Sequence, residues 1–463
     1  MNKAILRKGA LLAFAGSSAL VMATQANAAA FYLQEQSVKA EGRAFSGEVS
    51  ERGAQQMWWN PASIGGIDTI QNYFGLSAIL PHGDSTNVNS TVSRPGIPLG
   101  ALTGLPLPNI GASTTPVGGV QNRHNPIHNG YVPNGGIGIP LGDKLAVGFT
   151  ITSPYSFTTK YDADSWARYG ADKSRLRTLD FQPVVAFSPT KSISIGAGPN
   201  IEYIRATLSN YLPDPLPAIP LFNPVQNDGH QYLKGTAWDV GYSVGVQYHN
   251  HLVDLGVSYK SKITHKVKGH LIVDGITDPL LVAQGANQRI DNAHAEFTTP
   301  WQLIFGGRVH VTPQLTVNGQ VSRFGWNKFD AIRLSNLGPN PDQAVPENYR
   351  NTWSYAAGFD YLVSQKWTVR GGVQRDLTPI IDGFRDARVP DGNRWNFAAG
   401  TSYALTSHFT MDAAANYLKI KSERISATSV AYFGTPVQTI IHEDGLLHNA
   451  HAVILSVGGS VTF

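Results

Sequence analysis

The chain has 463 residues and no cysteine, and only 15% of its residues are charged. The lack of cysteine excludes a disulfide framework and thiolate metal ligands. The formal net charge is only +4. Three of the bases, Lys3, Arg7 and Lys8, lie in the first 28 residues, which hold no acid, so the rest of the chain carries a net charge of +1. We therefore expect no nucleic-acid partner.

Long hydrophobic runs are also missing beyond residue 28, where no stretch approaches the length of about 18 apolar residues that a spanning helix needs. This absence excludes helical spans but not a membrane β-barrel, whose strands alternate lipid-facing apolar residues with small or polar residues that face the lumen. The mean hydropathy of -0.15 is compatible with either class.

The first 28 residues predict a secretory signal peptide. Basic residues precede an uncharged, mostly apolar run over residues 9–23, and the small-residue pattern Ala26-Asn27-Ala28 follows it. A membrane anchor is the alternative, but the run is short for a spanning helix and a cleavage pattern comes directly after it. We expect residues 1–28 to be removed on export.

From Asp143 onward the sequence shows the two-residue period of β-strands. In residues 238–248, Trp, Val and Tyr occupy one face and mostly small or polar residues the other. A soluble sandwich would turn the apolar face inward, whereas a barrel turns it toward lipid. About 14 segments show this pattern, and single-chain bacterial barrels have an even number of strands. The pattern predicts an all-β fold, a transmembrane antiparallel β-barrel of about 14 strands over residues 67–463, in a bacterial outer membrane.

The connections between these segments alternate in length. Short turns at 188–191, 249–251 and 364–366 alternate with long polar or Pro-rich stretches at 209–229 and 328–348. Short periplasmic turns and long external loops are typical of outer-membrane barrels. The chain ends on Phe463. A terminal Phe on an alternating strand resembles the outer-membrane assembly signal, so we expect the barrel assembly machinery as a partner.

Residues 29–66 do not fit the barrel pattern. They are rich in charge and glycine, and they end with the motif Asn60, Pro61 and Ala62. A segment this polar cannot face lipid, so it lies in the periplasm or in the lumen. We predict an N-terminal hatch over residues 29–66 that plugs the barrel.

Pro154 interrupts an otherwise regular strand over residues 145–157. Proline cannot donate to the β-ladder, and a closed barrel has no edge strand to hold it. Two interpretations follow from the residue alone. The membrane strand ends just before Pro154, or Pro154 creates a local gap in the wall.

No constellation for catalysis or metal binding stands out. Ser243 lies in a Gly-Tyr-Ser-Val-Gly segment that matches the nucleophile elbow of hydrolases, but the elbow needs a strand-to-helix turn and this segment lies in mid-strand. The histidines are scattered, and no H-E-x-x-H occurs. We predict a protein that is not an enzyme, with no catalytic residue, no metal site and no cofactor.

Several motifs together resemble the FadL family of outer-membrane long-chain fatty acid transporters. The likeness covers nearly the whole chain after residue 28 and is weakest in the external loops. The motifs that carry it are residues 42–48, Asn60-Pro61-Ala62, residues 131–134, residues 151–155, residues 238–241, the pair Phe324 and Trp326, and residues 390–395.

The resemblance implies fourteen strands around an N-terminal hatch, uptake of hydrophobic compounds without an energy source, and a kink in the third strand that opens the wall laterally. The kink corresponds to Pro154, Tyr155 and Ser156 in this chain. Because proline removes a backbone donor, it would weaken the ladder where an opening is needed. The resemblance therefore favours the gap over a simple strand end.

The implied route begins with capture of a hydrophobic small molecule by external loops and continues to a lumen pocket near the mature N-terminus. Arg394 corresponds to the basic residue of the family's Pro-Asp-x-x-Arg motif, and it would meet a ligand carboxylate or form a lumen salt bridge with Asp391 or with a hatch acid. The candidate ligand-binding residues are Phe31, Tyr32, Leu33, Phe157, Trp166, Leu221, Phe222 and Arg394.

The substrate is left open at this point. The family's basic pocket residue after the fifth strand has no match in residues 203–210, so neutral aromatic hydrocarbons are an alternative to long-chain fatty acids. A general diffusion porin and an outer-membrane hydrolase are further alternatives. We expect a monomer surrounded by outer-membrane lipid.

Overall fold

The computed structural model describes residues 30–96, 106, 109–215, 228–283, 285–338 and 340–463. The predicted signal peptide and two ligand-binding candidates, Leu221 and Phe222, lie outside the described residues. Within the described ranges, no helix combines the length and apolar character that crossing a membrane would require.

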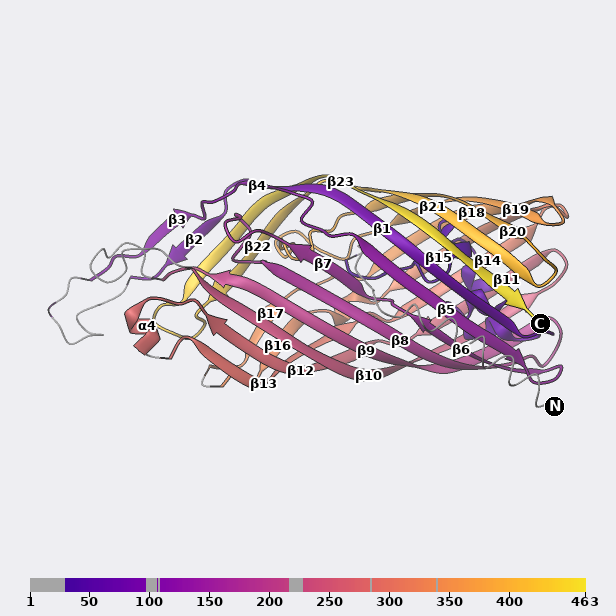
Figure 1. Ribbon diagram of the computed structural model, residues 1–463, viewed down its shortest axis with the longest axis horizontal. Helices are drawn as coiled ribbons and strands as arrows, with labels where there is room; N and C mark the ends of the chain where they lie inside the picture. Colours follow the sequence, from indigo (N-terminus) through magenta and orange to yellow (C-terminus); the bar gives the residue numbers. More distant parts are fainter. Residues whose placement is uncertain (1–29, 97–105, 107–108, 216–227, 284, 339) are drawn as a thin grey trace.

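Fourteen antiparallel strands form a closed barrel, which confirms the predicted fold class (Figure 1). The first and last strands close it, with Gln71 opposite Thr462. The strands are β1 (Gln71–Asn87), β5 (Gly130–Pro140), β6 (Leu145–Thr152), β8 (Lys173–Phe187), β9 (Ile193–Leu212), β10 (Gly229–His249), β11 (Val253–Lys260), β14 (Gln302–His310), β15 (Leu315–Phe324), β18 (Thr352–Ser364), β19 (Trp367–Asp376), β20 (Arg394–Ala404), β21 (Phe409–Ile420) and β23 (Thr439–Thr462).

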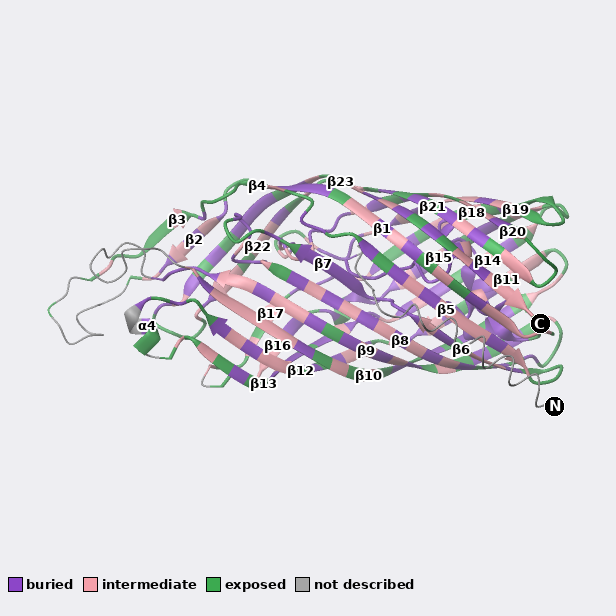
Figure 2. Ribbon diagram, viewed as in Figure 1, coloured by how far each residue is buried: buried purple, intermediate pink, exposed green. Residues whose placement is uncertain are grey.

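The strands alternate between a lipid face and a lumen face, which Figure 2 shows as bands of exposed and buried residues. In β10, Trp238 and Val240 are 61% and 66% exposed, whereas Ser243 and Gln247 of the opposite phase are buried. The apolar side chains therefore point away from the lumen. This arrangement suits a wall whose outer surface meets lipid.

Short turns gather at the end of the barrel that also holds the C-terminus, and the longer connections lie at the other end (Figure 1). Parts of the connections predicted at 209–229 and 328–348 form strands, which give their backbone donors partners. The additional elements are β2 (Thr91–Arg94), β3 (Ser113–Pro116), β4 (Asn122–His124), β7 (Ser156–Lys160), β12 (Ile263–Asp274), α4 (Pro279–Ala283), β13 (Gln288–Thr299), η4 (Trp326–Lys328), β16 (Ala331–Ser335), β17 (Gln343–Pro346) and β22 (Glu423–Ala431).

The wall is interrupted at the predicted kink. Strand β6 ends at Thr152, and β7 begins only at Ser156, although both pair with β8. On the other side, the pairing of β5 with β6 ends at Gly135 opposite Ile151, while β5 itself continues to Gly130. An isolated bridge between Ile127 and Thr159 re-joins the two sides further out. The strand thus ends at Thr152, before Pro154, and its ladder with β5 is interrupted there.

The segment over residues 30–66, called the hatch below, lies inside the barrel and is almost entirely buried. It holds one helical turn and three 3-10 turns: α2 (Val38–Glu41), η1 (Glu48–Ser50), η2 (Ala54–Gln56) and η3 (Pro61–Ile64). Wall glycines allow the hatch to approach closely. A Cβ atom added to Gly42 would lie 2.9 Å from the Cα atom of Gly400 in β20.

Candidate functional site

The start of the hatch pairs with the kink through its backbone. The N–H of Leu33 donates to the Pro154 carbonyl (2.8 Å), and the N–H of Ser156 donates to the Phe31 carbonyl (3.0 Å). Tyr32 and Tyr155 form an isolated antiparallel bridge between these two bonds. The hatch thus supplies, from inside, the β-partner that the wall lacks at Pro154. Backbone groups at membrane depth need such partners, because lipid offers none.

Aromatic rings surround this junction. The ring centroid of Phe31 lies 6.0 Å from that of Tyr155, 5.9 Å from that of Phe157 and 5.1 Å from that of Trp326. The hydroxyl of Tyr32 donates to Gln302 in β14 (3.1 Å), and the amide of Gln302 donates to Tyr155 (3.4 Å). The structure therefore brings Phe31, Tyr32 and Phe157 together in one apolar cluster that borders the kink. Leu33 packs in a separate cluster, with Ile79 and Val132 of the wall.

Arg394 lies at a polar edge near the same junction. Its guanidinium is 3.2 Å from the Asp391 carboxylate and 3.5 Å from that of Asp376. Asp391 also accepts the backbone N–H of Ala30 (2.9 Å). Arg394 thus has carboxylate partners within the protein, and the predicted salt bridge with Asp391 is present. A ligand carboxylate would have to compete with both acids.

The motif Asn60, Pro61 and Ala62 fixes the far part of the hatch. The Asn60 side-chain oxygen accepts the N–H of Ala62 (3.0 Å) and so caps the 3-10 turn η3. Its amide nitrogen donates to the carbonyls of Val49 in the hatch (2.7 Å) and Val246 in the wall (3.2 Å). The motif therefore joins the hatch to strand β10 of the wall through polar contacts.

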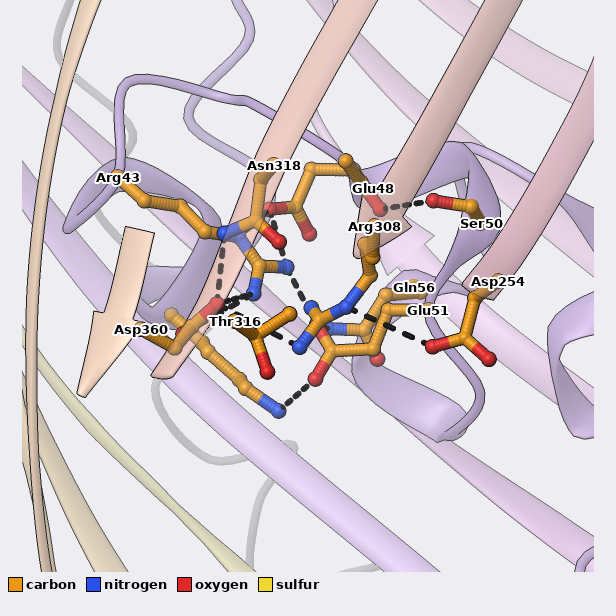
Figure 3. Close-up of polar contacts among 12 residues, drawn as sticks. Arg43, Glu48, Ser50, Glu51, Gln56, Asp254, Arg308, Thr316, Asn318 and Asp360 are labelled. Atoms are coloured by element: carbon orange, nitrogen blue, oxygen red, sulfur yellow. Dashed lines mark hydrogen bonds and ion pairs between the residues drawn. The ribbon is translucent and has the colours of Figure 1, made fainter. Parts of the chain in front are cut away.

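A buried ion-pair network anchors the middle of the hatch to the wall (Figure 3). The Arg43 guanidinium contacts Glu48, Glu51 and, at 3.0 Å, Asp360 of β18. Arg308 of β14 reaches Glu51 at 2.9 Å, and Arg370 of β19 reaches Asp360 at 2.6 Å. Sequence reasoning missed this network. The only signal was a set of charged residues in the lumen-facing phase of their strands, which does not name their partners.

Two other residues that the sequence singled out lie apart from the junction. Trp166 packs with Tyr161 (6.4 Å between ring centroids) and donates to the Ser85 carbonyl, in a separate apolar cluster of the external loops. Ser243 is buried in the lumen face of β10, and its hydroxyl donates to Asn200. No group of three or more metal-ligating side chains occurs in the described ranges.

A cavity of about 670 Å³ opens among the external elements α4, β16, β17 and β22. Its wall is mostly apolar, and its polar side includes Glu347, Asp386, Arg388 and Glu443. Ile332 of β16 lines this cavity and also belongs to the apolar cluster that contains Phe31. Sequence reasoning did not find the cavity, because its lining comes from segments more than 200 residues apart.

Two buried carboxyl groups of the hatch respond to pH. Burial raises the pKa of Glu35 to about 7 and that of Glu41 to about 8, and the nearby Glu35 carboxylate adds to the rise at Glu41. Glu41 accepts hydrogen bonds from Ser77 and Ser456 of the wall. A solvent-exposed glutamate has an ordinary pKa of 4.5. At a pH above 4.5 but below these raised pKa values, Glu35 and Glu41 are protonated in the docked hatch and would be ionised in a released hatch.

We expect docking of the hatch to weaken as the pH rises. The stabilisation is complete below about pH 4.5 and is lost as the pH rises through about 7 to 8, so between pH 6 and pH 9 the docking equilibrium should fall about 10-fold through Glu35 and about 100-fold through Glu41. A spin label on Ser37→Cys, in a chain without other cysteines, reports this as a growing mobile fraction. Glu41→Gln should remove most of the pH dependence. A mobile fraction equal at both pH values would contradict the assignment.

A closed barrel with alternating faces, a lumen occupied by its own N-terminal segment and a break in the wall beside that segment define an outer-membrane transport protein. The family model described as outer membrane protein transport protein (OMPP1/FadL/TodX) matches residues 19–463. The chain belongs to this family, and the suspected FadL relationship is confirmed. The family comprises transport proteins rather than enzymes, so the hydrolase alternative based on Ser243 is not supported.

Curated relatives and solved structures agree with this placement. The long-chain fatty acid transport protein of Salmonella typhi is 23% identical over 88% of this chain and 91% of its own length. A putative outer membrane protein of Neisseria meningitidis serogroup B is 26% identical over 91% of each chain. The crystal structure of a Pseudomonas aeruginosa FadL homologue has a TM-score of 0.78 at 21% identity, covering 94% of this chain and all of that one. The likeness to this structure is one of fold.

Proposed function

We propose that the protein imports hydrophobic small molecules passively, by capture in the external cavity, passage to the apolar cluster and lateral release through the break at Pro154. Long-chain fatty acids are the proposed substrates. The observation that carries the proposal is the backbone pairing of Phe31 and Leu33 with Ser156 and Pro154. A single displacement of residues 31–33 would remove Phe31 and Tyr32 from the apolar cluster and would break the backbone hydrogen bonds to Pro154 and Ser156.

Capture is supported by the size and position of the external cavity. Its volume of about 670 Å³ lies in the range of small-molecule binding sites. Ile332 lines the cavity and also belongs to the cluster around Phe31, so the two sites share an apolar side chain. A solute could therefore move between the two sites along apolar side chains without crossing water.

Neutral hydrocarbons are a second candidate substrate, and the cavity's charges favour them. One arginine, Arg388, faces three carboxyl groups there, those of Glu347, Asp386 and Glu443. Burial raises the pKa of Glu347 above its ordinary value, and the Asp386 carboxylate adds to the rise. Such a site offers a fatty acid carboxylate little net attraction. Fatty acids are supported instead by the curated relatives named as long-chain fatty acid transport proteins.

Pro154→Val is expected to lower uptake about 5-fold in proteoliposomes, because a restored backbone donor strengthens the ladder by about 1 kcal/mol. Labelled oleate and naphthalene, measured separately, would distinguish the two substrate classes. Pro199→Val, which adds a donor in β9 away from the kink, is the matched control. Undiminished uptake of both solutes by folded Pro154→Val would rule out lateral release. The substrate class is checked separately, by mass spectrometry of the ligand that copurifies with the unmodified protein.

A further inference from the structure

A patch of basic side chains lies on the outer surface of β8, β9, β10 and β12. Arg177 in β8 is directly opposite Arg205 in β9, and that row continues through Thr236 to Lys268. The next row outward joins Arg175 to Lys234 through Thr207. The basic patch is defined by five side chains: Arg175, Arg177, Arg205, Lys234 and Lys268.

These side chains point away from the lumen. Arg205 and Lys268 are exposed, and Thr236 between them shares the phase of the outward Trp238 and Val240. Arg175 and Arg177 alternate with Ser174, Leu176 and Thr178, which are buried. The patch therefore belongs to the surface that meets the surroundings of the barrel, and it is independent of the transport route proposed above.

The patch lies at the boundary of the membrane. Directly on its membrane side, the Trp238 ring centroid is 5.1 Å from that of Tyr203 and 5.7 Å from that of Phe181. Below them, β10 continues with apolar residues toward the short turns. Aromatic rings of this kind mark the interface between the hydrocarbon core and the head groups. The cations thus stand at head-group level, on the side of the long connections.

These cations have no ion-paired counter-charge among the described residues. None of the five takes part in an ion pair with a described residue, and the Nε atoms of Arg175 and Arg177 are buried without a hydrogen-bond partner. A contrast is Lys266 of β12, which has Glu296 opposite. Like charges directly opposite each other across a ladder destabilise it. The pair Arg177 and Arg205 therefore needs an anion from outside the chain.

We propose that this patch binds a phosphorylated lipid of the external leaflet, with its phosphate on Arg177 and Arg205 and an acyl chain along Phe181, Tyr203 and Trp238. Guanidinium groups bind phosphate through two parallel charge-assisted hydrogen bonds, and a lipid phosphate at head-group level meets them at the required depth. The aromatic rings below accept the apolar part. An acidic protein would satisfy the charges but not the apolar rings beneath them.

The test measures binding of lipid A in its phosphorylated and dephosphorylated forms to the full chain in detergent, by native mass spectrometry. We expect the phosphorylated form to bind at least about 10-fold more tightly. Arg177→Gln with Arg205→Gln should remove this preference and leave binding of the dephosphorylated form unchanged. Lys144→Gln with Lys191→Gln removes two exposed charges at the short-turn end and serves as the control, for which we expect the preference to persist.

Equal binding of the two forms to the unmodified chain would overturn the proposal without any variant. So would an equal loss in both double variants, because it would indicate a response to net charge alone. Inorganic phosphate, added as a competitor, should weaken lipid binding only at high concentration, since it lacks the acyl chain. Heat-modifiable electrophoretic mobility confirms that each variant forms the barrel.

Discussion

An oxidised disulfide between Tyr32→Cys and Tyr155→Cys is expected to stop uptake, and reduction is expected to restore it. The two residues form an isolated antiparallel bridge. Their Cα atoms therefore lie about 4.5–5.5 Å apart, which a disulfide can span without backbone movement. A disulfide typically adds about 2–4 kcal/mol, so displacement of the hatch start should become roughly 100-fold rarer.

The chain has no cysteine of its own, so the two introduced cysteines can form only the intended intramolecular disulfide. Each single variant controls for the loss of a tyrosine ring and of its contact with Gln302. The measurement is uptake of labelled oleate by proteoliposomes before and after treatment with a reductant. If the oxidised double variant transports as fast as its reduced form, residues 31–33 do not move during transport and the proposed release step is wrong.

Arg43→Met is expected to release the hatch and give the barrel a measurable ion conductance. The substitution removes the cation that contacts Glu48, Glu51 and Asp360. Removing one partner of a buried charge network typically costs about 3–5 kcal/mol, because the remaining charges stay desolvated. Released carboxylates would draw water into the lumen, and a plugged barrel would become a pore. Single-channel recording in planar bilayers measures this directly.

Two variants sharpen the conductance experiment. Lys39→Met removes a charge at the partly exposed edge of the same network and should give almost no conductance. Arg43→Met with Asp360→Asn removes a charge of each sign and should conduct less than Arg43→Met alone. If a correctly folded Arg43→Met barrel gives no measurable ion conductance, the ion pairs of Arg43 do not hold the hatch in the lumen.

The strands could be predicted from the sequence because their signal is local. The alternation of residues 238–248 predicted which side chains of β10 face outward, and the exposures of Trp238 and Val240 agree. Pro154 also carried local information, since a missing donor must interrupt a ladder wherever the strand is paired. In both cases the residues themselves impose the geometry.

The partners of these features could not be predicted in the same way. Tyr32 meets Tyr155, and Arg43 meets Asp360 of β18, across long stretches of chain with no pattern linking them. Arg394 was an easier case because Asp391 is three residues away. Contacts between hatch and wall depend on the closed barrel, which places distant strands around one lumen.

The close approach of hatch and wall limits how this protein can be altered. Gly42 and Gly400 face each other so closely that a Cβ on Gly400 would lie 2.5 Å from the Cα of Gly42, and a side chain on Gly196 would collide with the backbone of Pro61. Hatch and wall are therefore a fitted pair rather than exchangeable modules. A hatch grafted from a relative will seat only if the wall glycines that receive it are transferred together with it.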